Sequence, residues 1–227
     1  MPVQTILFDI NETVLDLNRL KPKFNHYFGS EDYMTTWFSM LLHSSTVCLV
    51  TTVHSDFKSL ALTALKALAG RLDKSISDEG YQDILSTLAA LPAHEDVKPA
   101  MDMLKLSGFR LVALSNSSTK LLNSQLSFAG LKDYFDDTIS VEQANTFKPS
   151  KSAYLFALQQ LQIAPSQARL VATHDWDTHG ALSAGLKAAY INRSGAPYNS
   201  YYLMPDIVSN SMIEIAQQIM EKENRQP

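Results

Sequence analysis

Polar side chains suited to chemistry gather in four short segments of the chain. The segments are Asp9-Ile10-Asn11-Glu12-Thr13, Ser115-Asn116-Ser117, Phe147-Lys148-Pro149 and Thr173-His174-Asp175-Trp176-Asp177. An aspartate held in a turn can act as a carboxylate nucleophile, and a nearby lysine would keep it ionised. Hydroxyl and amide groups can hold the oxygen atoms of an anionic substrate. These residue types predict attack by a carboxylate on a small molecule.

Asp9 is the candidate nucleophile because it directly follows an apolar run, residues 3–8. The backbone N–H groups of residues 10–13 could surround its carboxylate, and Thr13 could fix the turn through its hydroxyl. The alternative is a turn aspartate that only caps the chain. Ser115 and Asn116 could likewise be a polar turn that opens a helix, and Lys148 a solvated surface lysine.

These segments require elements that bring them together, and the hydrophobic pattern supplies such elements. Apolar runs typical of buried parallel strands alternate with segments of helical length. The predicted strands are residues 3–8, 110–114, 138–141, 170–173 and 187–191, and the predicted helices between them include residues 99–106, 119–129 and 152–161. Such alternation predicts a parallel sheet with helices on both faces, whose ligand lies outside the carboxyl ends of the strands.

Residues 15–91 differ from this pattern because they carry helical periodicity without a convincing buried strand. We therefore predict two parts: a core of residues 1–14 and 92–227, and a helical cap of residues 15–91 inserted after the first strand. The cap would lie over the carboxyl ends of the strands. Trp37 and Phe38 could line a pocket there, although packing inside the helical bundle is an alternative for each.

Composition excludes several other classes of protein. The 227 residues are 45% apolar and 19% charged, which excludes a disordered or fibrous chain. A formal charge of −4 predicts no binding to nucleic acid or to an anionic membrane surface. Cys48 is the single cysteine, in an apolar run that predicts a buried thiol, so neither an intramolecular disulfide nor a thiolate zinc cluster can form. The absence of a signal-peptide or membrane-spanning pattern predicts a cytoplasmic location, and the polar residues 221–227 are expected to fray.

The four segments, in chain order, resemble the motifs of the haloacid dehalogenase superfamily over essentially the whole chain. A strand ending in FDxNxT is followed by LSN, FKP and WDxxGA. The FDINET start, the insert after the first strand, and the LSNSS and INRSG segments look most like type II L-2-haloacid dehalogenases. The resemblance implies a Rossmann-like, doubly wound α/β core with a helical cap. It also implies attack of a carboxylate on the α-carbon of a 2-haloacid, with an ester intermediate hydrolysed to a 2-hydroxy acid and halide.

The resemblance assigns catalytic roles to four residues. Asp9 corresponds to the nucleophile, Thr13 to the threonine of the first motif and Lys148 to the lysine of the third. Asp177 corresponds to an aspartate that activates water or positions the lysine, and we expect it to face Lys148. The predicted substrate-binding residues are Asn11, Trp37, Phe38, Ser115, Asn116, Tyr154, His174 and Trp176. We also expect a small anionic substrate, catalysis without a cofactor or a metal ion, and a homodimer.

The chain departs from the dehalogenase pattern at a few positions. Ser39 follows Trp37-Phe38 where the family has a halide-abstracting arginine, so His43 or Arg19 would have to replace that cation. Ala172 and His174 stand where the family has a serine and an asparagine.

Two alternative functions are weighed against the dehalogenase. A phosphatase of the same superfamily needs an aspartate as general acid and an acidic residue for Mg²⁺, where this chain has Asn11 and Ala172. A binding protein that has lost efficient turnover is favoured by the missing arginine and opposed by the complete set of catalytic side chains. Dehalogenase chemistry fits these residues best.

Overall fold

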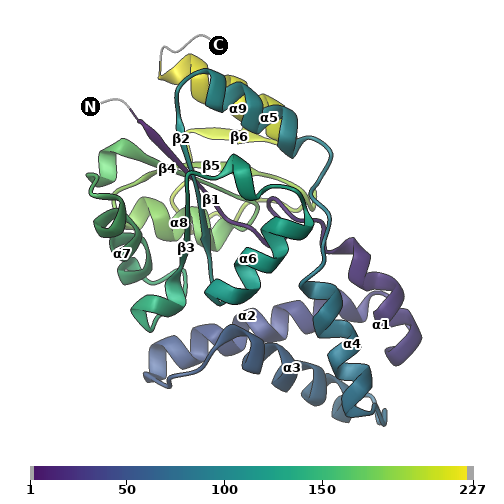
Figure 1. Cartoon of the computed structure of the whole chain (residues 1–227). Helices are drawn as coiled ribbons and strands as arrows, with labels where there is room; N and C mark the ends of the chain where they lie inside the picture. The colour runs from purple at the N-terminus through teal and green to yellow at the C-terminus, as the bar shows by residue number, and fades with distance from the viewer. Residues whose placement is uncertain (1–2, 224–227) are drawn as a thin grey trace.

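The computed structural model describes residues 3–223, and its centre is a six-stranded sheet (Figure 1). The strands are β1 (Thr5–Phe8), β2 (Arg110–Ser115), β3 (Asp137–Ser140), β4 (Ala168–Ala172), β5 (Lys187–Ile191) and β6 (Ile207–Ser209), in the order β3-β2-β1-β4-β5-β6. Every neighbouring pair is parallel; Phe8, for example, lies opposite Ala113 and Val171. All carboxyl ends therefore meet at one edge, where β1, β2 and β4 deliver Asp9, Ser115 and Thr173.

Successive side chains of a strand point to opposite faces, and both faces of this sheet are buried. Ile6 and Phe8 belong to one apolar cluster, which also contains α5 (Val97–Leu106) and α9 (Met212–Lys222). Leu7 belongs to a second cluster, which contains α7 (Lys151–Leu161). α6 (Thr119–Phe128) packs with the first cluster and α8 (Asp175–Ser183) with the second. The architecture is thus the expected α/β arrangement, with helices on both faces of a parallel sheet.

Four helices between β1 and α5 form a bundle of their own below the sheet in Figure 1. They are α1 (Lys21–Phe28), α2 (Tyr33–Thr51), α3 (Phe57–Arg71) and α4 (Asp78–Leu88), preceded by a 3-10 turn, Leu17–Leu20. Trp37 is fully buried in this bundle against Phe24, with ring centroids 5.3 Å apart, and its indole N–H donates to the Ala61 carbonyl. None of the helices within residues 3–223 has the length and hydrophobicity that crossing a bilayer requires.

The two connections between this bundle and the sheet lie side by side. The N–H of Asp16 donates to the Pro92 carbonyl, and the N–H of His94 donates to the Val14 carbonyl. Leu15 also forms a bridge with Ala93. The outgoing and returning segments therefore support each other directly beyond the end of β1.

The C-terminal part of the chain contains elements that the sequence analysis did not predict. β6 forms the edge of the sheet, and α9 packs on α5. The expected fraying from residue 221 is wrong for the described residues, because Glu223 is buried and accepts hydrogen bonds from Arg169 and Lys187. Residues 224–227 lie outside the described part of the chain. The expectation of a buried Cys48 is also wrong, since this thiol is only half-buried.

Candidate active site

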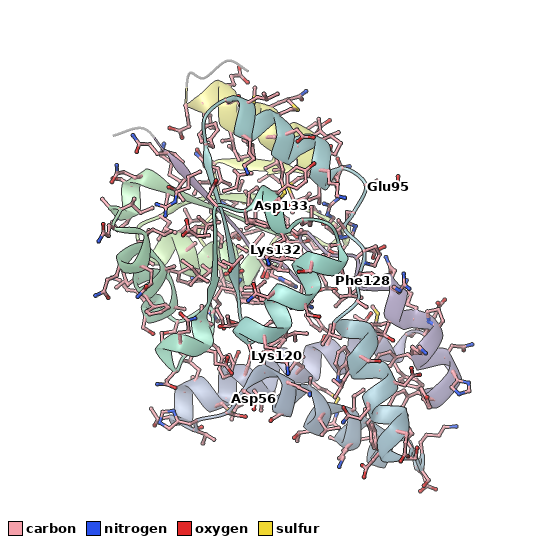
Figure 2. All side chains as sticks on the ribbon, in the orientation of Figure 1. Asp56, Glu95, Lys120, Phe128, Lys132 and Asp133 are labelled. Carbon is pink, nitrogen blue, oxygen red and sulfur yellow. The ribbon has the colours of Figure 1, made fainter. Side chains whose placement is uncertain are left out.

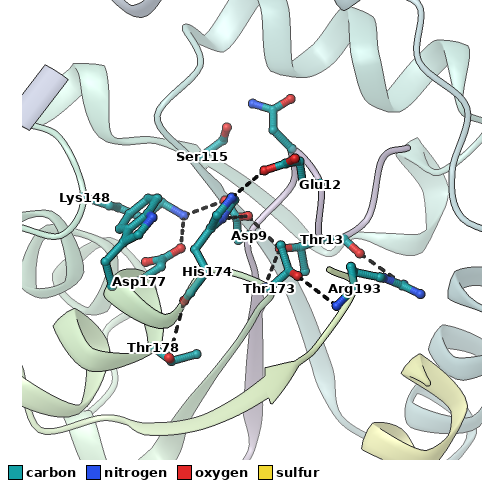
Figure 3. A network of polar contacts seen from close by, with 12 residues as sticks. Asp9, Glu12, Thr13, Ser115, Lys148, Thr173, His174, Asp177, Thr178 and Arg193 are labelled. Atoms are coloured by element: carbon teal, nitrogen blue, oxygen red, sulfur yellow. Dashed lines mark hydrogen bonds and ion pairs between the residues drawn. The ribbon is translucent and has the colours of Figure 1, made fainter. Parts of the chain in front are cut away.

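The Asp9 carboxylate lies at the centre of a polar network at the carboxyl edge of the sheet (Figure 3). Its Oδ1 accepts a 2.8 Å hydrogen bond from Lys148 Nζ, and its Oδ2 accepts one of 2.7 Å from Thr13 Oγ1. His174 Nδ1 lies 3.4 Å from the same Oδ2. Side chains therefore hold this carboxylate, and not the N–H groups of residues 10–13 that the sequence suggested. Burial alone would raise the pKa of Asp9, but Lys148 and His174 hold it well below its ordinary value.

Lys148 links Asp9 to a second buried carboxylate. Its Nζ lies 2.6 Å from Asp177 Oδ2 and donates to the Leu114 carbonyl, which confirms that Asp177 faces Lys148. Burial would lower the pKa of Lys148, but Asp177 and Asp9 raise it, so the ammonium stays charged. The pKa of Asp177 is raised because burial and Asp9 outweigh the attraction of Lys148. The cluster is thus a buried cation between two carboxylates.

The segment after β2 positions Lys148. The amide oxygen of Asn116 accepts the backbone N–H of Lys148 at 2.8 Å, and Ser115 Oγ accepts the N–H of Ser117. Ser115 and Asn116 are both buried, and within the described chain no side chain or carbonyl accepts from Asn116 Nδ2. The structure therefore places both residues beside the Asp9–Lys148 pair, with one amide N–H₂ group free of protein partners.

Glu12 was missed by the sequence analysis, and it pairs with His174 on the other side of Asp9. His174 Nε2 lies 2.8 Å from Glu12 Oε2, while its Nδ1–H is not aligned for a hydrogen bond with Asp9. Burial would lower the pKa of His174, but the carboxylates of Asp9 and Glu12 raise it to about 10. The imidazole is therefore a charged imidazolium near neutral pH, and Asp9 lies between two cations.

Thr13 connects this network to a group of supporting hydrogen bonds that the sequence analysis also missed. Its Oγ1 accepts the N–H of Thr173, and its carbonyl accepts Arg193 Nη2 (Figure 3). Arg193 makes two 2.8 Å hydrogen bonds to the Asp96 carboxylate. The INRSG segment drew attention to this region, but no spacing in the sequence pointed to an Arg193–Asp96 pair.

Asn11, which the sequence predicts to bind substrate, takes part in a structural bracket within the protein. Its Nδ2 donates to Ser117 Oγ, and its Oδ1 accepts Gln125 Nε2. Gln125 Nε2 also donates to the Leu88 carbonyl at the end of α4. The Asn11 amide is therefore occupied in joining the end of β1, the start of α6 and the cap.

Gln125→Met should lower the free energy of unfolding by about 1–3 kcal/mol, because it leaves the Asn11 and Leu88 oxygens buried without a donor. Urea denaturation followed by circular dichroism measures the change. The matched control is Gln160→Met on the exposed face of α7, which should change stability by less than about 0.5 kcal/mol. Equal stability of the two variants would show that the bracket contributes nothing.

Two further predicted substrate-binding residues have other roles in the structure. Trp37 points into the bundle core and its N–H is occupied, so it cannot line a pocket. Tyr154 is fully buried and donates its hydroxyl to Asp177 Oδ1, so it orients a carboxylate instead of contacting substrate. Phe38 and Trp176 do reach the site, with ring centroids 6.2 and 5.0 Å from that of His174.

Of the residues considered as replacements for the cap arginine, Ser39 and Arg19 have surroundings away from the Asp9 network, whereas His43 shares a cavity with Lys148. Ser39 is exposed on α2 and lines an open depression beside Arg71. Arg19 is exposed, and its guanidinium lies 5.5 Å from the ring of Phe128 at the end of α6 (Figure 2). His43 lines a cavity of about 260 Å³ together with Lys148 and Trp176. Within residues 3–223, the cations that pair with Asp9 are Lys148 and His174, and neither belongs to the cap.

The groups around Asp9 do not fit a Mg²⁺ ion, which requires oxygen ligands. The Lys148 ammonium and the His174 imidazolium lie against the two oxygens of the carboxylate. Ala172, at the end of β4, has no side-chain oxygen. Within residues 3–223, no group of three or more His, Cys, Asp or Glu side chains is arranged to hold a metal ion.

Comparison with known proteins gives consistent results. A family model described as a haloacid dehalogenase-like hydrolase matches residues 3–185. (S)-2-haloacid dehalogenase 1 of Pseudomonas sp. (strain CBS-3) is 28% identical, over 96% of this chain and 97% of its own. Haloacetate dehalogenase H-2 of Moraxella sp. (strain B) is 22% identical, over 90% and 92% of the two chains. The structure of L-2-haloacid dehalogenase from Xanthobacter autotrophicus with covalently bound chloropropionic acid is 23% identical with a TM-score of 0.88, over 96% and 98%.

Proposed function

The chain belongs to the haloacid dehalogenase-like hydrolase family, and from this premise we propose that it is a type II 2-haloacid dehalogenase with Asp9 as nucleophile. The observation that carries the proposal is the Asp9 carboxylate, which is buried, ionised and held between Lys148 and His174. The names of the relatives support the substrate class, since they act on (S)-2-haloacids or haloacetate. The substrate would be a small carboxylate with a halogen on its α-carbon.

The first step would be displacement at carbon. An Asp9 oxygen forms a bond to the α-carbon, and the carbon–halogen bond breaks with its electron pair leaving on the halide. This step needs no proton donor to the leaving group, so the occupied amide of Asn11 is compatible with it. Ser115 and the free Nδ2 of Asn116 would hold the substrate carboxylate beside Lys148. Water then hydrolyses the Asp9 ester and gives the 2-hydroxy acid.

A paired release assay tests the proposal. The protein is incubated with chloroacetate, bromoacetate, fluoroacetate and both enantiomers of 2-chloropropionate, and separately with a panel of small phosphomonoesters. The expected result is the release of one halide ion for each haloacid molecule consumed. Phosphate release without halide release would instead identify a phosphatase. Release of neither product would indicate a binding protein.

Turnover is expected to be independent of Mg²⁺, because two cationic side chains already neutralise Asp9 and Ala172 supplies no third ligand. Halide release should continue at an unchanged rate in excess EDTA, and added Mg²⁺ should leave both the rate and the melting temperature unchanged. Activity that disappears on chelation and returns with Mg²⁺ alone would contradict this expectation and favour the phosphatase.

A further inference from the structure

His174 joins two carboxylates at the carboxyl end of β4 (Figure 3). Its Nε2 is anchored 2.8 Å from Glu12 Oε2, and its Nδ1 faces Asp9 Oδ2 at 3.4 Å. A carboxylate that holds one ring nitrogen fixes the orientation of a histidine and stabilises its charged form. The other nitrogen then lies next to the nucleophile without a hydrogen bond to it, at the place where a proton has to move when an ester of Asp9 is hydrolysed.

The Glu12–His174 pair is built into the fold. Glu12 has a φ of 65°, a left-handed conformation that residues with a side chain adopt at an energetic cost. His94 Nε2 lies 3.0 Å from the Glu12 carbonyl and helps to hold this turn. The imidazole ring of His174 stacks on Trp176 and lies near Phe38 of α2. These contacts hold the imidazole ring between Glu12 and Asp9.

The pair borders an open cavity. Glu12 and His174 line a cavity of about 840 Å³ together with Thr173 and Arg193, and the His174 side chain is 13% exposed, while its Nδ1 atom is covered on the Asp9 side. The groups on the other side of Asp9 are less suited to accept a proton. Lys148 is charged between two carboxylates, and both oxygens of Asp177 are occupied by Lys148 and Tyr154.

We propose that His174, oriented by Glu12, is the base that activates water for hydrolysis of the Asp9 ester. The inference rests on the proposed function, because it requires the ester that a haloacid forms. In the free enzyme the pKa of His174 is raised, so this residue is an imidazolium that lies between Asp9 and Glu12. Esterification makes Asp9 neutral and so removes one of the two groups that raise the pKa of His174, and in the proposed cycle His174 then releases its proton to solvent. That proton and the halide together are the HX produced overall.

The hydrolytic step then restores the starting state. Neutral His174 Nδ1 takes one proton from water while the water oxygen forms a bond to Asp9 Cγ. The bond from Cγ to the substrate oxygen breaks, and the departing 2-hydroxy acid keeps the electron pair and receives the second proton of the water. Asp9 is again a carboxylate and His174 again an imidazolium. Glu12 is a positioning residue in this cycle, and His174 is the catalytic residue.

His174→Gln separates the two steps. Rapid mixing with 2-chloropropionate should still release a burst of halide equal to the enzyme concentration, because Asp9 and Lys148 are intact. The following steady-state rate should fall roughly 10²–10⁴-fold, as for loss of a general base. Mass spectrometry of the intact protein should detect the Asp9 adduct. Glu12→Gln should also keep the burst, with a smaller fall in kcat.

The control is His179→Gln, which makes the same change on α8. The His179 ring stacks on Tyr202 and its Nδ1 accepts the N–H of Leu203, so this variant should show neither a burst nor an adduct. His174→Gly in the presence of imidazole supplies a second measurement, since a free base in the vacated space should speed the slow phase. A purely structural role would not be rescued in this way.

The outcomes distinguish the inference from the function on which it rests. If His174→Gln loses burst and steady-state rate equally, or turns over at the wild-type rate, His174 is not the base although the wild type remains a dehalogenase. If the wild type itself neither releases halide nor forms an adduct with any haloacid, the proposed function fails and this inference fails with it.

Discussion

Asp9→Asn should abolish halide release, with a fall in kcat of roughly 10⁴-fold or more, because an amide oxygen cannot replace the carboxylate nucleophile. Lys148 keeps its contact with Asp177, and His174 keeps its contact with Glu12, so the fold should survive the change. The far-UV spectrum should therefore stay close to that of the wild type, which shows that the variant is folded. Halide electrode measurements with 2-chloropropionate give the rate.

Isotope labelling examines the same residue without a substitution. A single turnover of the wild type in H₂¹⁸O should place the label in the Asp9 carboxylate, because water attacks the enzyme ester and not the substrate carbon. Label in the hydroxy acid after that first turnover would mean direct attack by water and would exclude the covalent scheme.

Asp133→Asn is the matched control for the Asp9→Asn substitution. Asp133 lies on an exposed 3-10 helix (Figure 2), so this variant should release halide at the wild-type rate.

The sheet and the meeting of its strand ends could be predicted because they depend on local patterns. Buried runs such as residues 110–114 show the strands directly, and parallel neighbours must place their carboxyl ends together. The predicted strand began at residue 170, two residues after the true start of β4, because Arg169 is charged and a charged residue is not expected in a buried strand. Its guanidinium is paired with Asp206 and Glu223, which lie far along the sequence.

The parts that escaped prediction depend on pairing between distant side chains. Glu12 and His174 are 162 positions apart, and no periodicity relates them. Gln125 is fully buried because it bridges Asn11 and Leu88, although glutamine usually indicates a surface position. α9 is a different case, because Ser211 followed by Glu214 is a helix-start signal that could have been found.

Lys148 contributes to stability as well as to catalysis. It is the cation between Asp9 and Asp177, with its side chain 1% exposed, and each carboxylate is itself buried. Removing one member of a buried ion pair leaves the remaining charges without compensation and typically costs about 3–5 kcal/mol. The Asp9 pKa is depressed in the folded protein, so its stabilising contribution is present above its unfolded value near 3.8 and is lost as the pH falls toward the folded value. Without Lys148, the two carboxylates of Asp9 and Asp177 should instead make the folded protein more stable as the pH falls.

Lys148→Met should therefore lower the free energy of unfolding at pH 7 by about 3–5 kcal/mol and remove detectable dehalogenation. Without the lysine between them, Asp9 and Asp177 repel each other, and Asp177 has no cation against it, so its pKa should rise further and the folded variant should bind a proton that the unfolded chain does not. Its stability should then rise more steeply as the pH is lowered from 7 toward 5 than that of the wild type, whose smaller rise comes from the raised pKa of His174. Urea denaturation at several pH values measures both slopes, with exposed Lys132→Met as the control.

A double variant tests whether the charge pair is the cause. Lys148→Met combined with Asp177→Asn removes one carboxylate together with the cation, so it should recover part of the lost stability and flatten the pH dependence, but not restore turnover. The recovery is expected because Asp9 keeps His174 and Thr13 as partners once Asp177 no longer repels it. The alternative result is that the double variant is less stable than Lys148→Met by as much as Asp177→Asn alone destabilises the wild type. In that case the destabilisation arises from lost packing around the lysine side chain and not from uncompensated charge. The charge explanation therefore predicts a favourable coupling energy between positions 148 and 177, whereas the packing explanation predicts a coupling energy near zero.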